Sequence, residues 1–161
     1  DGLGSAVALS AAGTIAVVGV SGDDDALGRI DAGSARVFVR GATSWTEDAS
    51  LVAADGAIRG MLGASVALSA DGARALVGAP RDTAAGLTLA GRAHVFARSG
   101  TTWALESTLV AADAASDDGL GSAVALAADG SRALVGAAGD DGAGGTSSGS
   151  SSPLPASTMI S

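Results

Sequence analysis

A stretch of 19 residues occurs three times in the chain, and this repetition limits the folds that the chain can adopt. The copies begin at Leu3, Leu62 and Leu120, so they start 59 and then 58 residues apart. The second copy reads LGASVALSADGARALVGAP, and it agrees with the third copy at 14 of 19 positions. A fixed spacing of this kind is typical of proteins built from one repeated structural unit.

A second segment repeats in step with the first. The sequence AGSARVFVR, which starts at Ala32, returns as AGRAHVFAR in the next unit. The only Phe and Trp residues form two pairs, each separated by 58 positions, and there is no Tyr: the pairs are Phe38 with Phe96 and Trp45 with Trp103. The repeated unit therefore extends over most of the distance between copies, and we expect each Trp to pack where the last strand of its unit begins.

Each complete unit is expected to form four short strands, because short apolar runs alternate with turn residues. The expected strands are at residues 5–10, 15–20, 34–40 and 46–52 in the first unit, and at 65–69, 73–78, 92–98 and about 103–110 in the second. The last strand of a unit is richer in polar residues, as suits an outermost strand. We expect Arg40 and Arg98 to pair with Glu47 and Glu106 there.

The Asp71-Gly72 dipeptide predicts the first hairpin of the second unit. Asp-Gly favours a two-residue type I′ turn, in which both central residues have positive φ. Pairing across this turn sets Val66 opposite Val77 and Leu68 opposite Ala75 on one face, and it leaves Ala67 and Leu76 on the other. Both faces are apolar, as expected of a sheet that packs between two neighbours.

The third unit retains only its first hairpin before the composition changes. From residue 142 onward the chain is rich in Gly, Ser and Pro, which predicts a flexible segment. Residues 1–9 are identical to residues 118–126, so we expect the chain to be part of a longer protein. The predicted units are a first blade at 1–61, a second blade at 62–119, a partial blade at 120–141 and a disordered tail at 142–161.

Three motifs resemble those of the FG-GAP repeats. They are Leu-Gly at the start of each copy, Gly78-Ala79-Pro80 at the end of the second strand, and the later Gly-x-Ala-x-Val-Phe strand. The resemblance covers residues 1 to about 141, although Leu replaces Phe in the Phe-Gly position. The family forms the β-propeller of integrin α-chain heads and of many microbial and algal surface proteins. It implies an all-β fold, an incomplete β-propeller of about two and a half four-stranded antiparallel blades. A solenoid of stacked hairpins is the alternative architecture.

The resemblance implies a non-enzymatic module for protein–protein or adhesion-type interactions, at the cell surface or secreted. A protein or glycan ligand would bind at a rim of loops, for which residues 22–32 and 81–90 are the best candidates because they differ most between units. Two alternatives stay open: an accessory propeller domain of a larger extracellular enzyme, and a degenerate gene product without a stable fold. Two and a half blades leave apolar sheet faces uncovered, which predicts self-association.

Charge and hydropathy argue against nucleic-acid binding and against a membrane-spanning helix. The net charge is −8 and the pI is about 4.3, whereas proteins that bind nucleic acids show clustered Lys and Arg. No apolar stretch approaches the 18 residues of a membrane-spanning helix. We therefore expect no nucleic-acid partner and no transmembrane segment in this chain.

Integrin-type FG-GAP repeats often carry a calcium loop, Asp-x-Asp-x-Asp-Gly-x-x-Asp, between the first two strands. Here that connection is reduced to Ala-Asp-Gly-Ala or a variant, which supplies at most one carboxylate, whereas calcium takes six to eight oxygen ligands. We therefore expect no cofactor. The remaining cation candidates are the acidic residues after the second strand of each unit, for which solvated turns are the competing interpretation: Asp23, Asp24, Asp25, Asp31, Asp82, Asp140 and Asp141.

His94 is the only histidine, and it aligns with Arg36 of the first unit. A catalytic triad or a zinc site would require partners at suitable spacing, and none is evident in the sequence. We therefore expect no catalytic residue.

Overall fold

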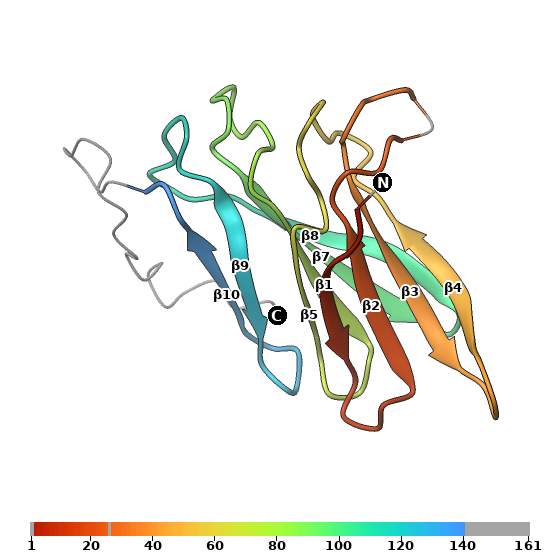
Figure 1. The fold of residues 1–161 in the computed structure, drawn as a ribbon. Coiled ribbons are helices and arrows are strands. Elements are labelled where there is room, and N and C mark those ends of the chain that lie inside the picture. Colours follow the sequence, from red (N-terminus) through yellow and green to blue (C-terminus); the bar gives the residue numbers. More distant parts are fainter. Residues whose placement is uncertain (1, 26, 141–161) are drawn as a thin grey trace.

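The computed structural model describes residues 2–25 and 27–140, which form ten strands and no helix. The prediction of an all-β chain is confirmed, and Figure 1 shows the arrangement. The strands are β1 (Leu3–Leu9), β2 (Ile15–Val20), β3 (Ser34–Arg40), β4 (Trp45–Leu51), β5 (Ser65–Leu68), β6 (Arg74–Ala79), β7 (Arg92–Ser99), β8 (Thr102–Leu109), β9 (Leu120–Leu126) and β10 (Ala133–Ala137). The predicted tail at 142–161 lies outside the described residues.

The strands form three open antiparallel sheets. Sheet 1 has the order β1-β2-β3-β4, sheet 2 has the order β5-β6-β7-β8, and sheet 3 pairs β9 with β10. Strand β5 lies between β1 and β9 (Figure 1), so the three sheets follow one another in chain order. No helix that could cross a membrane occurs in residues 2–25 and 27–140.

The predicted register of the second hairpin is confirmed, but its predicted turn is wrong. Val66 pairs with Val77 and Leu68 with Ala75. Of the two central residues that a type I′ turn would need, only Gly72 has a positive φ, at 72°. The Gly72 N–H donates to the Ser69 carbonyl at 3.0 Å, so the turn lies one residue earlier than predicted.

The side chain of Asp71 explains this turn. Its carboxylate accepts hydrogen bonds from the Ala73 N–H at 2.9 Å and from the Ser69 hydroxyl at 2.6 Å. An Asp that bonds its own backbone two residues on mimics a turn. A longer loop with one left-handed glycine therefore replaces the two-residue turn. The first hairpins of the other two units have the same glycine, Gly13 and Gly130, with φ of 62° and 70°.

Two apolar cores lie between the sheets. We term the face of a sheet that meets the following sheet its back face, and the opposite face its front face. The back face of sheet 1 packs on the front face of sheet 2 through Val17, Ala35, Val37 and Leu51 on one side and Ala75, Val77 and Phe96 on the other. The back face of sheet 2 packs on sheet 3 through Leu76, Ala93 and Val95 against Leu120 and Val135. Both predicted faces of the second unit are thus buried.

Pairs of glycines set how closely neighbouring sheets approach. A Cβ atom on Gly19 would lie 1.9 Å from the carbonyl oxygen of Gly63, and one on Gly78 would lie 2.1 Å from that of Gly121. Gly63 and Gly121 have φ of 90° and 96°, a conformation that favours glycine. Both members of each pair therefore have to be glycine.

We predict that Gly78→Ala lowers the free energy of unfolding by about 3 kcal/mol, because the added methyl group meets backbone that cannot rotate away. Denaturant unfolding at sub-micromolar protein concentration measures this change.

Gly136→Ala is the matched control, because Gly136 holds the same repeat position and its Cβ would come no closer than 3.6 Å to a neighbour. We expect its free energy of unfolding to fall by no more than about 0.5 kcal/mol. Equal losses in the two variants would contradict the role of the glycine pairs.

Candidate functional site

The long connections between strands gather at one end of the sheets, at the top of Figure 1. We term this region the loop end. Its four connections are residues 21–33, 52–64, 80–91 and 110–119. The opposite end carries the short hairpins, so the described residues of the predicted rim, 22–25, 27–32 and 81–90, lie at the loop end.

Backbone hydrogen bonds join the connections of neighbouring sheets. The Leu62 N–H donates to the Ala32 carbonyl at 3.0 Å, and the Gly119 N–H donates to the Leu89 carbonyl at 3.0 Å. Residues 33 and 62 also form a parallel bridge, as do residues 91 and 120. The loop end is therefore one braced surface rather than a set of separate loops.

An aspartate occupies the same position in every unit, four residues after the glycine of the second strand. These residues are Asp23, Asp82 and Asp140. All three are among the predicted cation candidates, but their equivalence was not predicted, although their equal spacing from Gly19, Gly78 and Gly136 indicates it. The Gly33 and Gly91 N–H groups donate to the main-chain carbonyls of Asp23 and Asp82 at 2.9 and 3.0 Å. The repeated aspartate thus closes the connection between the second and third strands.

In sheet 1 the side chain of Asp23 binds the start of β3. Its carboxylate accepts hydrogen bonds from the Ser34 hydroxyl at 2.7 Å and from Arg36 at 3.2 Å. The Ser34 hydroxyl, together with Arg36 and against a smaller effect of burial, lowers the pKa of Asp23. Arg36 also pairs with Glu47 at 3.1 Å, so the expected Arg40–Glu47 pair is wrong.

The other expected arginine pair is also wrong. Glu106 pairs with Arg74 on β6 at 2.8 Å, and Arg98 pairs with Asp48 of sheet 1 at 3.4 Å.

In sheet 2 the side chain of Asp82 is buried and binds two separate segments. Its Oδ1 atom accepts hydrogen bonds from the Thr83 N–H at 2.8 Å and from the Ala57 N–H at 2.9 Å. Its Oδ2 atom lies 3.8 Å from Arg92 Nε and 3.9 Å from His94 Nε2. Burial raises the pKa of Asp82, but His94, the two N–H donors and the charge of Arg92 outweigh it, so the pKa is lowered.

His94 lies between Asp82 and Thr108 in an order that superficially matches a hydrolytic triad. His94 Nδ1 lies 3.1 Å from the Thr108 hydroxyl. The 3.9 Å separation of His94 Nε2 from Asp82, however, exceeds the 2.6–3.2 Å over which triad members bond one another. The imidazole is also completely buried within sheet 2. This geometry supports a structural role for His94, which links β7 to β8 through the Thr108 hydroxyl.

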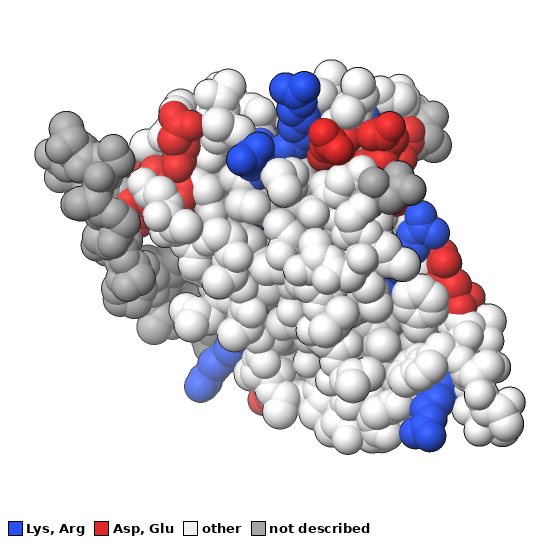
Figure 2. Space-filling view, viewed as in Figure 1, with Lys and Arg blue, Asp and Glu red and all other residues white. Residues whose placement is uncertain are grey.

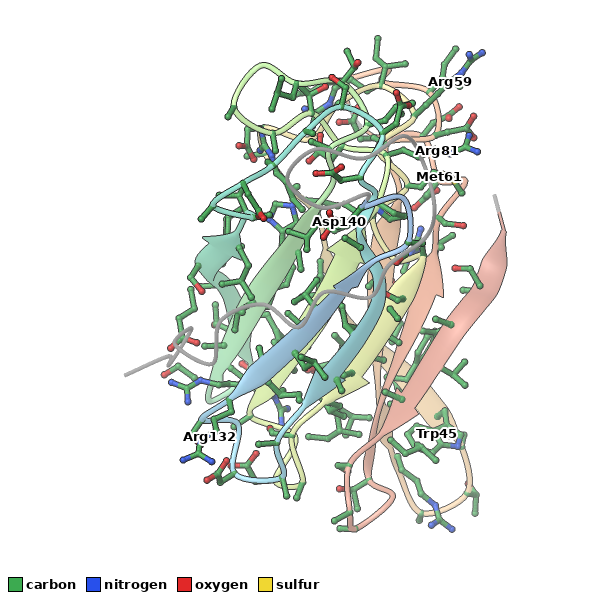
Figure 3. The ribbon with its side chains drawn as sticks, turned by 90° about the vertical axis from the view of Figure 1, so that its left-hand side faces the viewer. Trp45, Arg59, Met61, Arg81, Arg132 and Asp140 are labelled. Carbon is green, nitrogen blue, oxygen red and sulfur yellow. The ribbon has the colours of Figure 1, made fainter. Side chains whose placement is uncertain are left out.

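Several of the acidic candidates have partners of their own. Asp24 accepts the Asp31 N–H at 2.9 Å, and Asp25 binds the guanidinium group of Arg29 and the Leu27 N–H. In the part of the chain that the structure describes, no three His, Cys, Asp or Glu side chains form a group that could hold a metal ion. Asp140 lies at the loop end (Figure 3), and Asp141 is outside the described residues.

Charged side chains are concentrated at the loop end, whereas the middle of the molecule is formed mainly by uncharged residues (Figure 2). Arg59 and Arg81 project outward there, while Trp45 and Arg132 lie at the opposite end (Figure 3). Neither Arg59 nor Arg81 makes an ion pair within residues 2–25 and 27–140. The loop end therefore offers two guanidinium groups for external contacts.

Comparison with models of protein families finds the FG-GAP repeat at residues 45–96 and 103–152, more than half of the chain. The chain belongs to the FG-GAP repeat family. No curated protein matches it. FG-GAP repeats are typically β-propeller modules for protein interaction, generally non-catalytic and typical of extracellular or surface proteins.

The FG-GAP match is offset from the sheets by one strand. Its first segment begins at Trp45, the first residue of β4, and ends at Phe96 within β7. One family repeat thus consists of the last strand of one sheet and three strands of the next. The chain segment of a single repeat therefore runs from one sheet into its neighbour. Because the matched repeats begin before residues 62 and 120, the division at those residues stays a prediction.

The lowered pKa of Asp82 predicts a dependence of stability on pH. The folded carboxylate contributes stability above the unfolded pKa of about 3.9, and this contribution is lost as the pH falls through the lower folded pKa. We predict that the melting temperature decreases as the pH is lowered below about 4. The Asp82→Asn variant should show a smaller decrease. Asn retains an oxygen that can accept the Ala57 and Thr83 N–H groups, so the variant loses mainly the charge. The prediction is contradicted if the melting temperatures of the two proteins change equally with pH.

We also predict that millimolar calcium leaves the melting temperature unchanged, because Asp23 and Asp25 already bind arginine side chains. A ligand that binds only the folded chain would raise it. A rise with calcium that equimolar magnesium does not reproduce would instead establish a calcium site.

Proposed function

We propose that this FG-GAP chain is a non-enzymatic, adhesion-type interaction module of the cell surface or a secreted protein, and that its loop end binds a protein or glycan ligand. In this proposal the three sheets are blades of a β-propeller. One observation carries it: the long connections of neighbouring sheets meet at one end and are hydrogen-bonded to each other there. Loops held by a rigid scaffold are a common location for binding sites.

In this proposal two exposed arginines of the loop end bind carboxylate or other anionic groups of the ligand. Asp23 and Asp25 are already paired with Arg36 and Arg29. Arg59 and Arg81 are exposed and have no ion pair among the described residues. Arginine binds carboxylates through two parallel hydrogen bonds, which gives both affinity and orientation.

The test compares the unmodified chain with an Arg59→Glu/Arg81→Glu double variant on arrays of extracellular proteins and of acidic and neutral glycans. We expect at least one acidic ligand, whose binding weakens tenfold or more in the double variant because charge-assisted hydrogen bonds are lost. Arg132→Glu is the matched control, since Arg132 is exposed at the opposite end, and it should bind as the unmodified chain does. A ligand that binds all three proteins equally would place recognition elsewhere.

A further inference from the structure

Neighbouring sheets meet at the loop end through the same backbone arrangement. We term the meeting of sheets 1 and 2 the first junction and that of sheets 2 and 3 the second junction. The Arg59 N–H donates to the Ile30 carbonyl at 2.8 Å in the first junction, and the Asp117 N–H donates to the Thr88 carbonyl at 3.1 Å in the second. Arg59 and Asp117 also share a positive φ, of 61° and 72°. The two junctions can therefore be compared position by position.

A second hydrogen bond extends this equivalence to the connection after the second strand. The Arg81 N–H donates to the Gly60 carbonyl at 3.2 Å, and the Gly139 N–H donates to the Asp118 carbonyl at 2.8 Å. Arg81 and Gly139 therefore hold the same position. In the first junction this bond keeps Arg81 beside the segment that carries Arg59, and both arginines project outward (Figure 3).

The first junction has large apolar side chains where the second has small polar ones. Ile30 corresponds to Thr88, and Ile58 corresponds to Ser116. Ile30 is 55% exposed and Ile58 is 64% exposed, and neither is part of an apolar core. Because the same backbone forms with Thr and Ser in the second junction, the fold does not require the two isoleucines.

The exposure of these isoleucines is a property of their positions in the array of sheets. Ile58 lies in the connection between sheets 1 and 2, and the structure describes both. Thr88 is exposed although its own sheet has a neighbour on either side. The position that Ile30 holds in sheet 1 thus faces solvent even between two flanking sheets.

The charged side chains of the two junctions differ as well. Asp117 and Gly139 stand where the first junction has Arg59 and Arg81. Both arginines are exposed and make no ion pair within residues 2–25 and 27–140. Guanidinium groups beside exposed isoleucines therefore distinguish the first junction from the second.

Two carboxylates prevent this surface from being uniformly basic. Asp24 accepts the Asp31 N–H at 2.9 Å, and Asp31 directly follows Ile30. Neither carboxylate pairs with Arg59 or Arg81. A polyanion would meet these carboxylates and be repelled, whereas a single well-placed carboxylate can bind the arginines alone. The charges thus favour a ligand with one local acidic group over a polyanionic glycan.

We propose that the first junction binds a segment of a partner protein in which a large apolar side chain lies next to a carboxylate. The apolar side chain packs on Ile30 and Ile58, and the carboxylate binds Arg59 and Arg81. Exposed apolar residues rimmed by polar ones mark interaction sites, and arginine is enriched at protein interfaces. This inference rests on the proposed function, because it assigns the ligand of the same loop end to proteins rather than glycans.

The test selects binders of the unmodified chain from a phage-displayed library of random linear peptides. We expect the selected peptides to be enriched in large apolar residues next to Asp or Glu. Synthetic peptides of these sequences are then titrated by fluorescence anisotropy. They should bind the Ile30→Thr/Ile58→Ser double variant at least tenfold more weakly, because less apolar surface is buried on binding. The Arg59→Glu/Arg81→Glu variant should show a similar loss.

The Ile30→Thr/Ile58→Ser variant introduces the residues of the second junction, which the same backbone already accommodates. Its circular dichroism and melting temperature should therefore match those of the unmodified chain. Leu105→Ser is the matched control, since Leu105 is 44% exposed on β8, outside the loop end. It should bind the peptides as the unmodified chain does.

Three results would overturn the inference. They are a failure to select any peptide, selected peptides that bind the double isoleucine variant as tightly as the unmodified chain, and an equal loss in Leu105→Ser. Heparin, a sulfated glycan, is titrated in parallel, and heparin binding without peptide binding would also overturn it. The proposed function is judged separately by the double arginine variant. Any ligand whose binding weakens there keeps recognition at the loop end, even where the isoleucines have no effect.

Discussion

The close contact between glycines of neighbouring sheets is the constraint on which the rest of the structure depends. With 2.1 Å between a Cβ built on Gly78 and the carbonyl oxygen of Gly121, no side chain can separate the two backbones. This proximity lets small residues such as Ala35, Ala75 and Ala93 take part in the buried cores. It also explains why a chain with few aromatic residues can bury both faces of sheet 2. Close approach of the backbones substitutes here for side-chain size.

The same contact orders the loop end. In sheets 1 and 2, this contact holds β2 against the segment that leads into β5. The connection before β5, residues 52–64, then runs beside the connection before β3, residues 21–33. Bonds such as that from the Leu62 N–H to the Ala32 carbonyl follow from this alignment. Asp82 adds a side-chain link, because it accepts the Ala57 N–H from the connection between sheets 1 and 2. The surface proposed for binding is therefore a consequence of sheet packing.

The sequence predicted the strands to within two residues at most ends, and it predicted the register of Val66 with Val77, because alternation about a glycine turn leaves few other pairings. It could not predict the ion pairs. A bulge between Val37 and Phe38 brings Glu47 opposite Phe38, on the same face as Arg36, and one extra residue in a strand has no clear signature in a single sequence. It also could not reveal that Asp71 bonds its own loop, which shifts the turn. Of the loop end, the location was predictable, and so was the equivalence of the repeated aspartates, because each lies four residues after the glycine of a second strand.

The front and back faces of these sheets also connect architecture with binding. Every front-to-back contact places two neighbouring sets of connections on the same side of the array, because all strands keep their direction from one sheet to the next (Figure 1). Neighbouring sheets therefore present their connections side by side. Binding sites held side by side raise the effective concentration of each for a ligand with repeated groups, so avidity increases without a new contact. The glycine pairs that fix the spacing of the sheets would then also fix the spacing of the binding sites.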